Sequence, residues 1–384
     1  MEAALVTDIA LFLPSLHGGG AERVMLTLAN AMSARGYAVD LVLGTADGAY
    51  LKDVSPTLRV IDLKCKRVIR ALVPLARYLR QQRPRAMLSA LNHANIIAIS
   101  ANILTGGKTR LVVSEHSTIS VEASRARTLA AKVIYLLISK TYRQADGVIA
   151  VSKNAAEDLQ HFSRLPAGSV RAIYNPFDLA FIARQAERAP QHPWLAPGQP
   201  PLVIAIGRLT EPKEFPVLIR AFARVRALRV ARLLILGEGE LRNELSALVA
   251  KVGLTDADVQ MPGFVPNPFS YLERSSVFVL SSRWEGFGNV IVEAMACGTP
   301  VVSTDCPSGP REILEDGRWG RLVPPGDVES LAQAIESVLA TPRDLLPDVR
   351  TRAKDFDQHI AVDAYLDALG VVPATPLTIN PAIK

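Results

Sequence analysis

Short apolar runs alternate with helix-like segments along most of the chain, and this alternation restricts the fold more than any other feature. In the first half, runs typical of buried strands lie at Ile9–Leu13, Val39–Leu43, Met87–Leu91, Leu111–Val113, Gly147–Val151 and Val170–Ile173. In the second half, they lie at Leu202–Ile206, Arg232–Leu236, Val259–Met261, Val277–Leu280 and Pro300–Val302. Helical patterns such as Ala21–Arg35 fill most of the gaps. Strands separated by helices predict an α/β protein with parallel, doubly wound sheets.

The length of the chain indicates two such domains. Its 384 residues exceed what one typical hydrophobic core holds together. A proline-rich stretch from Ala189 to Pro201 is the candidate linker. We therefore expect Rossmann-like domains at residues 1–185 and 186–355, a C-terminal helix at 356–370 and a tail at 371–384.

Several features favour a cytoplasmic protein. The start of the chain has no basic region and carries Asp8 within its apolar stretch, so it is expected to be a first strand rather than a signal peptide. No run approaches 18 unbroken apolar residues, the length that a membrane-spanning helix requires. The three cysteines, Cys65, Cys297 and Cys306, have no C-x-x-C spacing, which argues against a disulfide framework and against a zinc site.

Positive charge is concentrated in the first half. Residues 1–180 hold 22 Lys and Arg against 13 Asp and Glu, whereas the remainder holds 21 against 24. No acidic residue lies between Leu63 and Ser114, and a second basic stretch, Arg125 to Arg143, has apolar residues at helical spacing. Basic amphipathic segments can lie on anionic membranes, and we expect such a peripheral contact. The alternative is an ordinary solvated face. No recognition motif indicates nucleic-acid binding.

The segment Val277–Val302 is the most informative single stretch. A short strand leads into a turn with Gly286 and Gly288, then a helix from Asn289 to Cys297 and another apolar run. Glu285 and Glu293 lie eight positions apart, about 12 Å if every step were helical. Because the paired carboxylates of glycosidases lie roughly 5–5.5 Å or 6.5–9.5 Å apart, gripping two ends of an elongated ligand is a more natural use of this pair. The helix N-terminus could hold an anion between them. Alternatively, Glu293 is a solvated helix residue and Glu285 an N-terminal charge favoured by the helix dipole.

Other candidates follow the ends of predicted strands, where doubly wound sheets bind ligands. Gly18–Gly20 ends one strand and would let backbone N–H groups approach a phosphate or a sugar hydroxyl, but it does not fit the dinucleotide motif G-x-G-x-x-G. Arg208 and Lys213 flank a turn and are suited to a diphosphate. His116 follows the strand Leu111–Val113, where a histidine can equally be structural.

Seven segments in order resemble the retaining family 4 glycosyltransferases, which have the GT-B fold. They are His17–Leu43, Ser114–His116, Gly207–Ala223, Leu233–Leu245, the EGFGNVIVEAMACGTPVV stretch from Glu285 to Val302, Ser303–Leu314 and Leu322–Ile335. The resemblance implies two Rossmann-like domains facing a central cleft, with the C-terminal helix crossing back onto the first. The variant pieces look most like transferases of bacterial lipopolysaccharide, capsule and exopolysaccharide assembly.

The resemblance also implies roles for individual residues. His116, Arg208, Lys213 and Glu285 would be catalytic: Arg208 and Lys213 hold the diphosphate, Glu285 binds a sugar hydroxyl, and His116 lies beside the donor sugar. Glu293 would bind the ribose, Phe287–Val290 the distal phosphate, and Gly263–Val265 the base. The expected substrate-binding residues are therefore Gly19, Gly20, Gly207, Gly237, Val265, Phe287, Gly288, Asn289, Val290 and Glu293. This sequence has Glu214 where the broad family usually has glycine, so whether the local backbone keeps the family's shape is left open, while the role of Lys213 is not affected.

The implied activity moves a hexose or N-acetylhexosamine from a nucleotide sugar, with UDP favoured, to a glycan or lipid-linked acceptor. The anomeric configuration is retained, and the leaving phosphate takes the acceptor proton. No cofactor and no metal are expected: two D-x-D matches, Asp256–Asp258 and Asp355–Asp357, agree with chance and follow no core strand. The alternatives are a sugar-nucleotide epimerase or hydrolase of the same architecture, and a non-catalytic sugar-nucleotide-binding partner.

Overall fold

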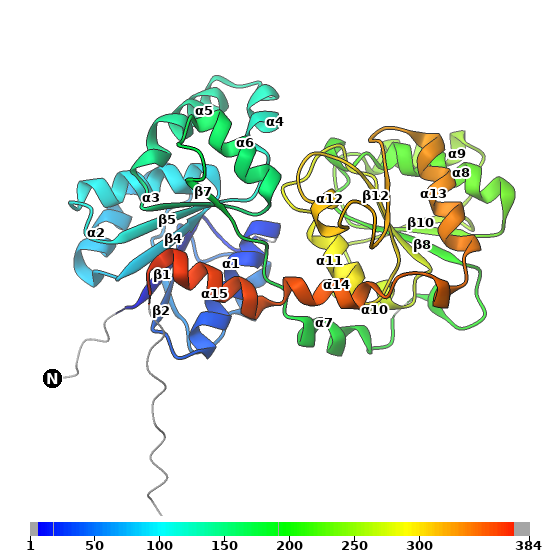
Figure 1. Cartoon of the computed structure of the whole chain (residues 1–384), viewed down its shortest axis with the longest axis horizontal. Helices are drawn as coiled ribbons and strands as arrows, with labels where there is room; N and C mark the ends of the chain where they lie inside the picture. Colours follow the sequence, from blue (N-terminus) through cyan, green and yellow to red (C-terminus); the bar gives the residue numbers. More distant parts are fainter. Residues whose placement is uncertain (1–6, 18, 191, 372–384) are drawn as a thin grey trace, which may run out of the picture. The chain divides into compact units, whose positions relative to one another are not determined.

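The computed structural model describes residues 7–17, 19–190 and 192–371, which form two compact units (Figure 1). Unit 1 contains the residues up to Pro176 together with those from Gln358 onward, and unit 2 is Phe177–Asp357. Each unit has its own parallel sheet with helices packed against it. The expected α/β class with two doubly wound sheets is confirmed.

The sheet of unit 1 has seven parallel strands in the order β3-β2-β1-β4-β5-β6-β7. The strands are β1 (Ile9–Leu13), β2 (Val39–Leu43), β3 (Arg59–Asp62), β4 (Ala86–Ala90), β5 (Arg110–Glu115), β6 (Gly147–Ala150) and β7 (Val170–Ala172). The helices are α1 (Gly20–Ala34), α2 (Leu72–Gln82), α3 (Asn92–Leu104), α4 (Ile119–Ser124), α5 (Leu129–Thr141), α6 (Lys153–Ser163) and α15 (Gln358–Leu369).

Alternate residues of β1 supply the cores on the two faces of this sheet. Ile9, Leu11 and Leu13 pack with residues of α1 and α15. Ala10 and Phe12 pack on the opposite face, with residues of α2, α3, α5 and α6. A strand that is buried on both faces has no polar positions to alternate with apolar ones, which is why β1 is a continuous apolar run in the sequence.

The sheet of unit 2 has six parallel strands in the order β10-β9-β8-β11-β12-β13. They are β8 (Leu202–Ile206), β9 (Arg232–Leu236), β10 (Val259–Gly263), β11 (Val277–Leu280), β12 (Val301–Thr304) and β13 (Arg321–Val323). The helices are α7 (Leu179–Ala186), α8 (Phe215–Leu228), α9 (Arg242–Lys251), α10 (Phe269–Glu273), α11 (Asn289–Ala296), α12 (Pro310–Ile313), α13 (Val328–Ala340) and α14 (Val349–Ala353). Val203 and Ala205 of β8 pack with α8, α9 and α13 in one core.

Two edge strands were not predicted from the sequence. β3 and β13 each pair with one neighbouring strand only, and most of their residues are at least partly exposed. Because an edge strand need not be buried on both faces, it lacks the apolar run that reveals a central strand.

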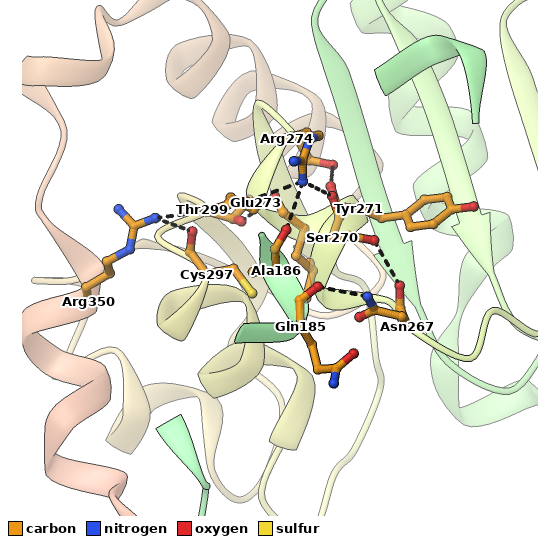
Figure 2. A network of polar contacts seen from close by, with 12 residues as sticks. Gln185, Ala186, Asn267, Ser270, Tyr271, Glu273, Arg274, Cys297, Thr299 and Arg350 are labelled. Atoms are coloured by element: carbon orange, nitrogen blue, oxygen red, sulfur yellow. Dashed lines mark hydrogen bonds and ion pairs between the residues drawn. The ribbon is translucent and has the colours of Figure 1, made fainter. Parts of the chain in front are cut away.

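The division between the units lies earlier than the expected boundary at 185/186, because α7 packs within unit 2 (Figure 2). Asn267 donates from Nδ2 to the Gln185 carbonyl at 2.8 Å, and Arg274 donates from Nη1 to the Ala186 carbonyl at 2.9 Å. The proline-rich candidate linker is also part of unit 2, where Trp194 is buried beneath the guanidinium of Arg232. The expected tail from 371 lies outside the described residues except for the buried Val371.

Strand order reverses at one place in each sheet. In unit 2, the chain winds outward in one direction from β8 and in the other from β11, and these two strands are neighbours. Loops that leave neighbouring strands in opposite directions open a crevice beyond the carboxyl ends of the strands, which is where such sheets bind ligands. The loops after β8 and β11 are therefore the expected ligand-binding region of unit 2.

Two glycines of unit 2 provide a matched test of close packing. Gly309 and Gly326 have φ values of +97° and +79°, so both disfavour a side chain. A Cβ on Gly309 would lie 1.7 Å from the Phe287 carbonyl oxygen, whereas a Cβ on Gly326 would meet no atom within 4 Å.

We expect Gly309→Ala to destabilise the protein more than Gly326→Ala. Both variants carry the conformational cost of about 1–2 kcal/mol, and the backbone overlap at Gly309 adds about 1–3 kcal/mol. Urea unfolding of the two variants measures the difference. Equal losses would show that the loop at Phe287 yields freely.

Candidate active site

Lys213 and Glu285, which are 72 residues apart in sequence, meet beyond the carboxyl ends of β8 and β11. The Lys213 ammonium lies 2.6 Å from Oε1 of Glu285. Their side chains are only 22% and 12% exposed. The two residues predicted to handle the diphosphate and the sugar therefore form a direct, partly buried ion pair.

Two serines directly after β11 hold this pair in place. Ser282 donates its hydroxyl hydrogen to Oε1 of Glu285 at 2.6 Å. Ser281 donates to the backbone carbonyl of Lys213 at 2.7 Å, and the N–H of Arg283 donates to the Pro212 carbonyl at 2.8 Å. The sequence placed both serines in a strand-end turn but gave neither a role, because their partners come from a distant loop.

The predicted glycines of this region allow the loops to pack closely. The Lys213 side chain lies along Gly207, whose added Cβ would be 3.4 Å from Lys213 Cδ. Gly237 has φ +141°, and an added Cβ would overlap the Gly207 carbonyl oxygen at 2.0 Å. Gly237 therefore needs to be glycine for this close backbone contact, whereas a Cβ at Gly207 would make only an ordinary contact with the Lys213 side chain.

Glu214 shows why glycine suits the position after Lys213. Its backbone is left-handed, with φ 45° and ψ 39°, a conformation that costs a residue with a side chain about 1–2 kcal/mol. The Glu214 side chain is buried and forms an ion pair with the guanidinium of Arg283. This sequence thus keeps the backbone shape that glycine adopts easily and adds a contact between the two loops.

The turn before α11 places the other predicted residues around the helix N-terminus. Gly288 precedes the helix with φ 97°, and Asn289 and Val290 begin it, both partly exposed. Phe287 is 3% exposed, and its ring packs against Phe356 at a centroid distance of 5.8 Å. Glu293 is only 7% exposed, so the alternative of a solvated helix residue is wrong.

Arg208 and Val265 lie at other parts of the same strand edge. Arg208 follows β8, and its side chain is exposed. Among the residues that the structure describes, no ion pair or side-chain hydrogen bond involves its guanidinium. Val265 follows β10 and is partly exposed. Arg208 is thus a cation available to a ligand, in contrast to Lys213.

The remaining predicted residues, His116, Gly19 and Gly20, belong to unit 1. His116 follows β5, and its Nε2 lies 3.1 Å from the Ser114 hydroxyl, which itself lies 3.3 Å from the Tyr365 hydroxyl of α15. Burial, which disfavours the charged form, lowers the pKa of His116 to about 4, so the ring is neutral near pH 7. Gly19 is the N-cap of α1, and Gly20 begins that helix. Gly18 lies outside the described residues.

A buried polar cluster lies next to His116. Tyr142 donates a hydrogen bond to Oε1 of Glu115, and Asn95 donates to the same oxygen at 3.0 Å. Burial nevertheless raises the pKa of Glu115 to about 7, because desolvation of the charge outweighs the two donors. The sequence offered no sign of this cluster beyond the position of Glu115 at a strand end.

The aspartates of both D-x-D matches make local contacts with nearby side chains. Asp258 accepts hydrogen bonds from Thr255 and from Arg226, and Asp355 accepts one from Arg352. Across the described ranges, no group of three or more His, Cys, Asp or Glu is placed to hold a metal ion.

We expect the Glu115 carboxyl to make stability depend on pH. Between about pH 4.5 and 7 the folded state keeps a proton that the unfolded chain has lost, so stability is full below this window and falls as pH rises through it. The shift corresponds to about 3 kcal/mol.

Urea unfolding of the wild type and Glu115→Gln across pH 4–8 isolates this contribution. The difference between the two free energies of unfolding should change across the window and be constant outside it. Tyr142→Phe removes a donor that favours the charged form, and the window should then extend to higher pH. A difference that is independent of pH would contradict the assignment.

Comparison with known proteins identifies the family of the chain. Residues 18–181 match the family model described as Glycosyltransferase Family 4, and residues 200–341 match Glycosyl transferases group 1. The chain is 33% identical, over 94% of its own length and 99% of the other, to a Campylobacter jejuni N-acetylgalactosamine-N,N'-diacetylbacillosaminyl-diphospho-undecaprenol 4-alpha-N-acetylgalactosaminyltransferase. A second C. jejuni N-acetyl-D-galactosaminyltransferase is 27% identical over 92% of this chain and 95% of that protein.

Solved structures show the same fold. Anabaena Alr3699/HepE in complex with UDP-glucose superimposes with a TM-score of 0.79 at 21% identity, covering 95% of this chain and all of that one. Sucrose-phosphate synthase from Thermosynechococcus elongatus gives 0.77 at 22% identity, with 95% and 100% coverage. The fold is therefore GT-B, and the chain is a glycosyltransferase that belongs to family 4.

Proposed function

We propose that this protein transfers a hexose or N-acetylhexosamine, with retention of configuration, from a UDP-sugar to a glycan or lipid-linked glycan in cell-surface polysaccharide synthesis. The observation that carries the proposal is the Lys213–Glu285 pair at the strand reversal of unit 2, beside the N-terminus of α11. It combines a cation suited to a diphosphate with a carboxylate suited to sugar hydroxyls.

The chemistry of sugar transfer requires such a cation. The diphosphate leaving group gains negative charge as the glycosidic bond breaks, and a preorganised positive charge stabilises that change. In the proposed complex, Lys213 moves from Glu285 to the diphosphate, and the exposed Arg208 supplies a planar second donor set. Glu285, still held by Ser282, then accepts from a sugar hydroxyl. With two cations in these roles, the reaction needs no metal ion.

The α11 turn completes the donor site in this proposal. Backbone groups of Phe287–Val290 bind the distal phosphate at the positive end of the helix dipole. Glu293 binds the ribose, and the loop at Val265 contacts the base. The leaving phosphate accepts the proton of the acceptor hydroxyl on the same face, so no protein nucleophile is assigned. The part played by His116, Gly19 and Gly20 stays a prediction from the resemblance.

The relatives support the choice of donor and acceptor classes. HepE was solved with UDP and glucose and with UDP-glucose. The C. jejuni relative that covers nearly the whole chain is named for transfer of N-acetylgalactosamine to a diphospho-undecaprenol-linked sugar. A lipid-linked acceptor places the reaction at the inner face of the cytoplasmic membrane, with peripheral contact through the basic unit 1.

We expect Lys213→Ala to reduce sugar transfer about 10²–10³-fold, the effect typical of removing one group that stabilises transition-state charge. Glu285→Gln keeps the shape of the side chain and should also reduce transfer strongly. Lys251→Ala, at an exposed cation at the end of α9, is the matched control and should leave transfer unchanged.

Release of labelled sugar from the donor, with and without an acceptor, is the measurement. Near-normal transfer by both Lys213→Ala and Glu285→Gln would refute the roles assigned here. Donor consumption that is independent of any acceptor would favour an epimerase or hydrolase instead.

We further expect UDP and UDP-sugars to raise the melting temperature of the protein, while GDP- and ADP-sugars do not. A ligand at a hundred times its Kd stabilises the folded state by about 2.7 kcal/mol, which corresponds to about 5–10 °C for a unit of this size. Lys213→Ala should abolish the shift. A shift with GDP- or ADP-sugars alone would contradict the UDP assignment.

A further inference from the structure

An unusual share of the exposed apolar surface lies on the helices of one face of unit 1. Fifteen large apolar side chains of the described residues are exposed, and eight of them belong to α2 with its preceding 3₁₀ turn, to α3 and to α5. These eight are Ile69, Val73, Ile103, Leu104, Leu129, Val133, Leu136 and Leu137. The elements pack on the same face of the sheet, with α3 in contact with both of the others (Figure 1).

Helix α5 concentrates this feature. Leu129 is 79% exposed and Leu136 is 54% exposed, and Val133 lies between them at helical spacing. Only Ile138 of the helix is fully buried. A helix that leaves several branched apolar side chains in water loses free energy that burial elsewhere would recover, so this surface suits a partner that covers it.

A cationic groove of about 540 Å³ runs beside these leucines. Its lining includes four basic side chains, Lys132, Lys140, Arg143 and Arg164. In the part of the chain that the structure describes, none of the four forms an ion pair or a side-chain hydrogen bond. Tyr135, Leu136 and Phe162 supply apolar walls, and the ring of Tyr135 packs edge-on against Phe162 at 6.4 Å.

The groove cations have no carboxylate partner among the described residues. Glu122 of α4 accepts a hydrogen bond from the Tyr135 hydroxyl at 3.3 Å and forms no ion pair with any of the four cations. Elsewhere in the protein, arginines such as Arg59, Arg226 and Arg229 are paired with carboxylates. The positive charge around α5 is therefore available to an external anion.

We infer that α5 and this groove form a docking surface for an anionic lipid bilayer. Leu129, Val133 and Leu136 enter the boundary between headgroups and acyl chains, while the groove cations bind lipid phosphates. The exposed leucine and valine side chains suit the acyl-chain region of a membrane surface, and the cations beside them suit its layer of phosphates. A nucleic acid would leave the leucines in water. This inference deepens the proposed function, because it locates the surface that contacts the membrane. It rests on the proposed function in one respect only, namely that a transferase with a lipid-linked acceptor has to reach a bilayer.

Co-sedimentation of the full chain with lipid vesicles tests the inference. We expect binding to phosphatidylcholine vesicles that contain about one-third phosphatidylglycerol, little binding to pure phosphatidylcholine, and weakening by salt. The triple variant Lys132→Gln, Lys140→Gln, Arg143→Gln should bind about a hundredfold more weakly, since each basic residue contributes roughly fivefold. The pair Leu129→Gln, Leu136→Gln should also lose most binding at unchanged charge.

Matched controls come from unit 2. Leu228 and Val230 are 74% and 62% exposed, and Lys251 and Lys354 are exposed lysines. Leu228→Gln with Val230→Gln, and Lys251→Gln with Lys354→Gln, should bind vesicles as the wild type does. Equal loss in these controls, or wild-type binding by both α5 variants, would overturn the inference, as would tighter binding to a short RNA duplex than to the anionic vesicles.

A readout that is independent of the membrane separates this inference from the proposed function. The α5 variants lie in unit 1, whereas the proposed donor residues belong to unit 2, so these variants should show the wild-type thermal shift with UDP. Vesicle binding without a UDP shift would refute only the donor assignment. A normal UDP shift without any preference for anionic vesicles would refute only the docking surface.

Discussion

The reversal of strand order between β8 and β11 is the constraint on which the candidate site depends. Because these strands are neighbours and their chains leave in opposite directions, the loops after them meet at the carboxyl edge of the sheet. Lys213 and Glu285 meet there across 72 residues of sequence. Neither residue would be unusual alone. Their proximity pairs a cation with a carboxylate at one place on the sheet edge.

Close backbone packing and two serines turn this proximity into a fixed geometry. Gly237 lets its loop approach the Gly207 carbonyl to a distance that any side chain at 237 would prevent. Ser281 and Ser282 anchor the Lys213 backbone and the Glu285 carboxylate respectively. Glu214 adds an ion pair with Arg283 between the same two loops, at the cost of a left-handed backbone. Together these contacts hold the loops after β8 and β11 against each other.

Charged residues serve two purposes in this protein. Arginines such as Arg59 and Arg229 are paired with carboxylates. Lys132, Lys140, Arg143 and Arg164 instead line a groove beside exposed leucines, and none of them has an ion pair among the described residues. No helix of the described ranges is long and apolar enough to span a bilayer. A surface contact through α5 is a different use of apolar residues, since it needs one exposed face rather than a continuous apolar segment.

The sequence by itself determined the fold class, the central strands and the residue types of the site. Strands such as β1 and β8 are buried on both faces and so leave a continuous apolar run, while the edge strands β3 and β13 do not. Only the tertiary structure decided that Lys213 pairs with Glu285, that Glu293 is buried, that Glu115 shares a core with Asn95 and Tyr142, and that α7 belongs to unit 2. Periodicity reports which side of an element meets the core, but contacts between distant segments depend on strand order and packing, which no local pattern records.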